Sequence, residues 1–234
     1  MKVLIGCEHS GIVRNAFLER GFDAWSCDVL PSDQPSNRHI QDDIRNVLKL
    51  DNWDLLAVMH PPCTRLCNSG VRWLTAPPPG KTLDQMWNEL DEGAALFSEV
   101  LNADIPHIAV ENPVMHKYAK QRIENYFEFS QSVQPWQFGT DTDGTDNVKK
   151  RTCLWLRNLP KLKATGTLDG STARDECHKA APGKDRWKLR SRFYEGIAAA
   201  MAEQWGDYVS SVVTPAAAPL TITETPKQFS LFAA

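Results

Sequence analysis

The sequence lacks three features that identify large classes of protein: a long apolar run, an excess of one charge and closely paired cysteines. Its apolar runs are too short to span a bilayer, and the opening residues MKVLIGCEHSG become polar too early for a signal peptide. A net charge of -3 argues against a basic field over the whole surface, so nucleic-acid binding would need a local patch. We therefore expect a cytoplasmic protein with no contact to a membrane.

The sequence also gives little support for a metal site. Structural zinc sites usually hold two closely spaced pairs of Cys or His, whereas the six cysteines here are scattered along 234 residues. A site would have to combine His60, Cys63 and Cys67 with Cys153 or Cys177. We expect no bound metal, and we expect most thiols to be free and buried as small apolar side chains.

What is present is an alternation of short apolar segments and helical patterns. It predicts strands at residues 2–6, 22–28, 54–60 and 107–112, and helices at 12–20, 42–50 and 83–101. The run at 54–60 shows no alternation with polar residues, which is typical of a parallel strand covered on both faces. The pattern predicts a doubly wound, mostly parallel α/β sheet with its binding sites at the carboxyl ends of the strands.

The pattern is looser after residue 125, up to a last helix predicted near residues 191–205. From Thr214 the chain is rich in Pro, Thr and Ala without a core pattern, which is typical of a flexible linker. We therefore expect one folded domain at residues 1–213, followed by a linker and a terminal peptide at 214–234.

Two of the predicted strands lead into residues suited to chemistry. Cys63 follows two prolines that fix the backbone, so its thiol is either an aimed nucleophile or a small buried residue at a turn. Glu111 closes an apolar strand and precedes Asn112. A carboxyl group at such a desolvated position can stay protonated and donate a hydrogen bond, and a helix-capping or salt-bridged carboxylate is the alternative.

The order of these residues resembles that of DNA cytosine-5 methyltransferases: Pro-Pro-Cys at 61–63, then Glu111-Asn112, then a basic cluster ending at Arg151. Those enzymes carry a loop of the form Pro-Cys-Gln-x-Phe-Ser-x-x-Gly. The corresponding segment here reads PCTRLCNSG, with Gly70 at the matching distance from the cysteine.

Other parts of the resemblance are weaker. The Gln-x-Arg-x-Arg motif of these enzymes is represented by Asn147, Lys149 and Arg151. Stretches such as QPWQFG and YEGIAAAMAEQWG look most like short, phage-encoded members, and the resemblance runs from about residue 2 to 206. It implies the Rossmann-like fold of methyltransferases that use S-adenosylmethionine.

The resemblance implies roles for individual residues. Cys63 would attack C6 of a cytosine, Glu111 would hold and protonate N3, and Arg151 would bind the cytosine carbonyl or a nearby phosphate. Pro62, Asn112, Lys149 and Arg65 would contact the substrate. The base would have to be flipped out of duplex DNA, because the sulfur cannot otherwise reach C6.

The methyl donor would lie over the first strands. The loop GCEHSG stands where the family has a glycine-rich loop, and it offers Gly6, Ser10 and Gly11. Asp28 ends the second strand and would bind the ribose hydroxyls. The pair Asp43 and Ile44 would hold the adenine, although capping of the following helix is an equally good reading of the acid. The resemblance also places Pro61 against the donor.

Sequence recognition would have to be minimal, because the 38 residues between Thr152 and Ser191 are too few for a separate recognition domain. Two segments are candidates for contacting DNA: Arg65 to Lys81, and the basic stretch at 179–192 with Trp187 available for stacking. A solvated surface loop is the alternative for the second segment.

The last residues, QFSLF, resemble the short peptide by which bacterial replication and repair proteins dock on the sliding clamp. Gln228, Leu231 and Phe232 would make that contact, because an apolar pair on a tether can enter a preformed groove. The alternative is an accidental tail.

The sequence thus predicts methylation of cytosine C5 in DNA, with S-adenosylmethionine as donor and DNA and the clamp as partners. Three alternatives stay open. In the first, the same chemistry acts on free cytidine nucleotide or single-stranded DNA. In the second, the methyl donor is a modified one. In the third, the chain binds DNA or the clamp without catalysis.

Overall fold

The computed structural model describes residues 1–176 and 193–213. The basic stretch with Trp187, Cys177, the linker and the terminal peptide with Gln228, Leu231 and Phe232 therefore lie outside the described residues. None of the described helices has the length and apolar character that crossing a bilayer requires.

The described part of the chain forms one seven-stranded sheet in the order β3-β2-β1-β4-β5-β7-β6. The first five strands in this order, β3, β2, β1, β4 and β5, are parallel, whereas β7 runs antiparallel to both of its neighbours, β5 and β6. The strands are β1 (Lys2–Gly6), β2 (Asp23–Asp28), β3 (His39–Gln41), β4 (Leu55–Val58), β5 (His107–Asn112), β6 (Gln131–Val133) and β7 (Thr152–Arg157). The predicted mostly parallel, Rossmann-like α/β fold is thus confirmed.

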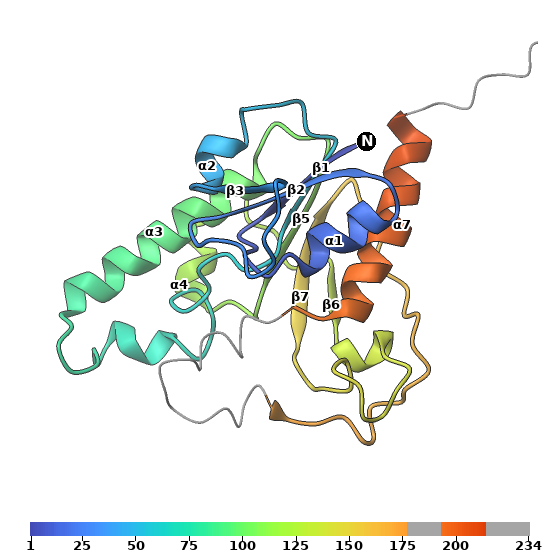
Figure 1. Cartoon of the computed structure of the whole chain (residues 1–234). Helices are drawn as coiled ribbons and strands as arrows, with labels where there is room; N and C mark the ends of the chain where they lie inside the picture. Colours follow the sequence, from blue (N-terminus) through green and yellow to red (C-terminus); the bar gives the residue numbers. More distant parts are fainter. Residues whose placement is uncertain (177–192, 214–234) are drawn as a thin grey trace, which may run out of the picture.

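Helices cover both faces of the sheet (Figure 1). They are α1 (Ile12–Glu19), α2 (Ile44–Val47), α3 (Leu83–Leu101), α4 (Lys117–Lys120) and α7 (Glu195–Val213), with the short 3-10 helices η1 (Val71–Leu74) and η2 (Pro135–Phe138). Helices α1 and α7 pack on one face through Phe17 and Trp205. Helices α2 and α3 pack on the other face through Ile44 and Phe97.

Local signals explain most of the predicted elements. The capping box is present at the start of α3, where the Thr82 hydroxyl accepts the Gln85 N–H at 3.2 Å and the Gln85 side chain accepts the Thr82 N–H at 2.9 Å. Gly21 adopts a left-handed φ of 79°, which ends the segment after α1.

Two predictions of helix extent were wrong. Helix α2 is one turn within the predicted 42–50, and α7 begins at Glu195 and continues to Val213. Strands β3, β6 and β7 were not predicted. Two of these strands are only three residues long, and β7 is held by partners that lie far away in the sequence.

Candidate active site

The loop after β4 is closed on itself by backbone hydrogen bonds. The N–H groups of Leu66 and Cys67 both donate to the Cys63 carbonyl at 3.0 Å. A Cβ at position 70 would lie 1.9 Å from the Thr64 carbonyl oxygen, so only glycine fits there. Cys63 itself is half-buried. The match of Gly70 to the family loop therefore has a steric cause in the closed turn.

A second set of hydrogen bonds ties this loop to the segment that follows β5. The Asn68 N–H donates to the Val114 carbonyl at 3.1 Å, and the His116 N–H donates to the Leu66 carbonyl at 3.1 Å. Cys67 and Met115 form an antiparallel bridge between them. The Pro-Pro-Cys loop and the Glu-Asn strand end are thus parts of one connected unit.

The imidazole of His116 strengthens that connection. Its Nδ1 accepts the Ala119 N–H at 3.2 Å, which leaves Nε2 to donate to the Arg65 carbonyl at 2.6 Å. Burial lowers the pKa of His116, which keeps the ring neutral and preserves its acceptor nitrogen at neutral pH. His116 therefore positions the Cys63 loop, a role that sequence reasoning missed because it depends on a fold contact.

Glu111 lies at the carboxyl end of β5, with 5% of its surface exposed. Burial raises the pKa of Glu111 to about 7, and the cation of Lys150 opposes that rise. Among the described residues no hydrogen-bond donor reaches the Glu111 carboxyl. Near pH 7 this group can therefore carry a proton and give it to a bound partner.

The cation beside Glu111 is Lys150, which sequence reasoning missed. Its Nζ lies 5.5 Å from the centre of the Tyr194 ring, on the α1/α7 side of the sheet. Arg151 instead donates from Nε to the Ser132 hydroxyl at 3.1 Å, and Lys149 is exposed. Side chains alternate along an extended chain, so residue 150 faces the side opposite to 149 and 151. Only the pairing of Glu111 with Leu154 fixes which side that is.

Two buried polar side chains near this point lack partners in the described part of the chain. Neither Nδ2 nor Oδ1 of Asn112 has a hydrogen bond, and the same holds for Nε2 of His60. Burial lowers the pKa of His60 well below its usual range, so its ring is neutral. Buried polar groups are normally hydrogen-bonded, so these atoms are suited to binding a ligand.

A cavity of about 620 Å³ lies between the ends of β1, β2 and β4 and the helices α2 and α3. It is lined by Asp28, Asp43 and Ile44 of the predicted donor residues, and by Pro62 and Arg65 of the predicted substrate residues. Further carboxylates in the lining are Asp42, Glu89 and Glu92, against the cations Arg45 and Arg65. The cavity is therefore acidic, and it brings together predicted residues from three segments of the chain.

Gly6, Ser10, Gly11 and Pro61 are not in the lining of this cavity. The first loop is organised instead around Glu8, which is fully buried and accepts hydrogen bonds from the Ser10 hydroxyl at 2.9 Å and the Val13 N–H at 2.8 Å. Gly11 has a left-handed φ of 77°, a backbone conformation that residues other than glycine rarely adopt. The carboxylate of Glu8 thus occupies the amino end of α1.

Asp43 caps α2, as the alternative reading of the sequence proposed. Its carboxylate accepts the Arg45 N–H at 2.9 Å, and Arg45 hydrogen-bonding lowers the pKa of Asp43. Because Asp43 also lines the cavity, a contact with adenine stays a prediction alongside the cap.

The five described cysteines are free thiols. Burial raises the pKa of Cys7, and it raises the pKa of Cys27 to about 12, so these two thiols are held protonated. In residues 1–176 and 193–213 no group of three or more His, Cys, Asp or Glu side chains is arranged to hold a metal ion.

Comparison with known proteins gives structural likenesses only. No protein-family model matches the chain, and no curated protein matches it. A candidate DNA modification methyltransferase encoded within an E. coli prophage superposes on 67% of this chain with a TM-score of 0.38 and 15% identity. A mutant of DNMT2 from Spodoptera frugiperda superposes on 78% with a TM-score of 0.37 and 14% identity. The matched regions span 46% and 60% of those two proteins.

Proposed function

We propose that residues 1–213 form a methyltransferase that acts on C5 of cytosine in DNA through a covalent adduct with Cys63. The observation that carries the proposal is the joining of the Cys63 loop to the strand end that holds Glu111. Hydrogen bonds from Asn68 to Val114 and from His116 to Leu66 connect the two elements. A thiol and a protonatable buried acid held in one unit are what attack on a pyrimidine ring requires.

In the proposed reaction, the Cys63 thiolate forms a bond to C6 of the cytosine. The electron pair displaced from the C5–C6 bond moves toward N3, where Glu111 supplies a proton, so that no negative charge accumulates on the ring. C5 becomes nucleophilic and takes the methyl group. Loss of the C5 proton to a base and breakage of the C6–S bond then restore the aromatic ring and the thiolate, and the N3 proton returns to Glu111.

Asn112 follows Glu111 in β5, and its amide has no partner in the described part of the chain. Its pairing with Cys153 directs it to the α2/α3 side of the sheet, opposite to Glu111, so its contact with the substrate is proposed from the resemblance alone. Lys150, whose charge acts on Glu111, would contact the base carbonyl or the adjacent phosphate. Arg151, Lys149, Pro62, Arg65 and Trp187 remain proposed substrate contacts. Of these, Arg65 forms an ion pair with Glu89, at 2.7 Å.

The acidic cavity supports an adenosyl donor that carries a positive charge. Five carboxylates and two arginines line it, and the amino end of α1 is occupied by Glu8. Both features disfavour a phosphate-bearing cofactor, which needs free N–H groups at a helix start. S-adenosylmethionine would supply the methyl group. Asp28 would hold its ribose, and Asp43 and Ile44 its adenine, with Gly6, Ser10, Gly11 and Pro61 as the remaining proposed contacts.

The substrate alternatives keep the same residues. Free cytidine nucleotide or single-stranded DNA would avoid base flipping, and a modified donor would change the group transferred. A binding protein without catalysis would make no use of a half-buried Cys63 in a loop joined to the strand end of a protonatable Glu111.

The decisive experiment is nucleoside mass analysis of DNA from cells that express the wild-type chain or Cys63→Ala. 5-Methylcytosine in the first sample and its absence in the second is the expected result. A different added mass on cytosine would identify an altered donor. Unmodified DNA from cells with abundant folded wild-type protein would contradict the proposal.

We further propose that the terminal peptide with Gln228, Leu231 and Phe232 docks the enzyme on the bacterial sliding clamp. A peptide of five residues should bind at roughly micromolar strength. A flexible tether would then keep the enzyme at high effective concentration near newly made DNA. Calorimetry with purified clamp tests this, and no binding at high micromolar concentration would refute it.

A further inference from the structure

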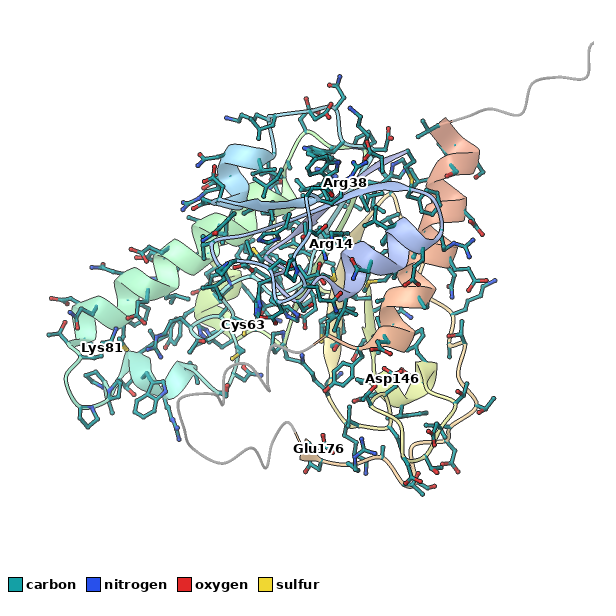
Figure 2. The ribbon with its side chains drawn as sticks, in the orientation of Figure 1. Arg14, Arg38, Cys63, Lys81, Asp146 and Glu176 are labelled. Carbon is teal, nitrogen blue, oxygen red and sulfur yellow. The ribbon has the colours of Figure 1, made fainter. Side chains whose placement is uncertain are left out.

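Cations and aromatic rings alternate on a surface built by η1, the first turns of α3 and the segment around α4. We call this the cation–aromatic surface, and its members are Arg72, Trp73, Trp87, Lys117, Tyr118 and Arg122. Helix α3 packs against both η1 and α4, so the three elements are neighbours. The chain from Cys63 to Lys81 runs along one side of α3 (Figure 2).

Each cation in this surface lies over a ring. The Arg72 guanidinium is 4.4 Å from the centre of the Trp73 ring, and the Lys117 ammonium is 4.9 Å from that of Tyr118. The Arg122 guanidinium is 4.9 Å from the Trp87 ring, which meets Tyr118 edge to face at 5.5 Å. These contacts hold the cations in place on partly buried aromatic groups.

The charges on this surface are only partly neutralised. Arg122 pairs with Asp91. Arg72 and Lys117 are exposed, and neither has a carboxylate partner among the described residues. Two positioned cations are therefore available to an anionic ligand, in a chain whose net charge is -3. A local patch of this kind is what such a chain needs in order to approach a nucleic acid.

The surface is continuous with the Cys63 loop. Lys117 and Tyr118 directly follow His116, whose ring bonds the Arg65 carbonyl at 2.6 Å and lies 6.0 Å from the Tyr118 ring. Arg72 and Trp73 directly follow Gly70 and Val71, where that loop ends. A strand whose base reached Cys63 would therefore have its flanking nucleotides near this surface.

We propose that the cation–aromatic surface binds the DNA strand next to the target cytosine. Arg72 and Lys117 contact its phosphates, and the exposed edges of the aromatic rings pack against sugars and bases. The inference names the substrate contacts of the proposed methyltransferase and so rests on that function. It requires no sequence-specific contact, because phosphates and base faces are common to all sequences.

The test is fluorescence anisotropy of the full chain with labelled single-stranded and duplex oligonucleotides over a range of salt concentrations. Arg72→Gln combined with Lys117→Gln should weaken binding about tenfold or more. The slope of log affinity against log salt should fall by about 0.7 per lost contact on single strands and about 0.9 on duplex. Lys49→Gln combined with Lys161→Gln is the matched control, since both lysines are exposed and lie away from this surface.

Equal affinity and equal salt slope for the two double variants would overturn the inference, as would wild-type protein that binds neither oligonucleotide. Thermal melts of the variants check that folding is intact. The result is separable from the proposed function, because binding is measured without a donor and with Cys63→Ala as well. DNA binding that depends on Arg72 and Lys117 supports the surface even if no base is modified.

Discussion

Glu8 and Glu111 are two buried acids beyond or at the ends of parallel strands, and burial raises the pKa of both. Glu8 accepts hydrogen bonds from the Ser10 hydroxyl, from the Val13 N–H at 2.8 Å and from the Arg14 N–H at 3.4 Å. The Glu111 carboxyl has no such donor in the described part of the chain.

The difference teaches how to separate a structural acid from a reactive one. Both oxygens of the Glu8 carboxyl accept hydrogen bonds that close the first turns of α1. The carboxyl of Glu111 is also buried, but it accepts no hydrogen bond from the described residues and so keeps its hydrogen-bonding capacity for another partner. Burial alone therefore does not distinguish the two acids, whereas the presence or absence of internal donors does.

The largest effect is expected from Cys63→Ala, which removes the nucleophile that Glu111 would serve. Methyl transfer should fall below detection, while donor binding measured by calorimetry should persist, because Cys63 does not line the acidic cavity. Retained transfer would mean that Glu111 serves a different reaction.

Substituting the two acids in turn sharpens the contrast between them. Glu111→Gln should slow single-turnover transfer by roughly a hundredfold or more, the usual scale for a positioned proton donor. Glu8→Gln should leave the rate per folded molecule near that of wild type. Because Glu111 must be protonated, wild-type transfer should decline as the pH rises through about 7. Equal transfer rates for Glu111→Gln and Glu8→Gln would contradict the assignment of a proton-donor role to Glu111 alone.

The two acids should affect the stability of the fold with opposite signs. Glu8→Ala leaves the Val13 and Arg14 N–H groups without the Glu8 acceptor and should lower the free energy of unfolding by about 1–3 kcal/mol.

The folded pKa of Glu111 is about 7 against an ordinary 4.5, so the folded state binds more protons than the unfolded state between these pH values and loses stability as the pH rises. That loss is on the order of 3 kcal/mol. Chemical denaturation from pH 4 to 8 should show that the free energy of unfolding depends less on pH in Glu111→Gln than in wild type. The same pH dependence in both proteins would refute the assigned pKa of Glu111.

A smaller effect is expected from Lys150→Gln. Removing this cation should raise the pKa of Glu111 further, because Lys150 stabilises the carboxylate. The pH at which transfer declines should therefore move upward. Burial raises the pKa of Cys153, and the charge of Glu111 raises it further, so this thiol stays protonated. Lys149→Gln is the control. If the pH at which transfer declines moved equally in both variants, Lys150 would not be the cation that sets the pKa of Glu111.

The smallest effect on catalysis is expected from changes in the terminal peptide. Leu231→Ala combined with Phe232→Ala should leave methylation of naked DNA nearly unaltered and should eliminate binding to the sliding clamp. A marked loss of methylation on naked DNA would show that the peptide belongs to the catalytic domain.

Much of the fold could be predicted because its signals are local. The apolar run before His60 identified a covered parallel strand, and Thr82 with Gln85 identified the start of α3. Strand β7 could not be predicted in this way, because its position depends on the register that pairs Glu111 with Leu154. That register also explains why Lys150, and not a residue of the expected motif, lies beside Glu111.

The candidate site shows the same division. Cys63, Glu111 and Asp28 were predicted from their positions at strand ends, and Asp43 from the resemblance. His116 was missed because its role depends on a contact with the Arg65 carbonyl, 51 residues away in the chain. The hydrogen bond from the Ser10 hydroxyl to Glu8 was also missed, because it depends on the backbone geometry of the first loop, which a residue pattern does not show.

The most direct test of the central claim is trapping with DNA that carries 5-fluorocytosine in place of cytosine, in the presence of S-adenosylmethionine. Fluorine cannot leave C5 as a proton does, so the C6–S bond should persist. We predict a denaturant-stable adduct in the wild-type protein, with the DNA attached to the peptide that contains Cys63. An adduct that forms equally well in Cys63→Ala would contradict the account.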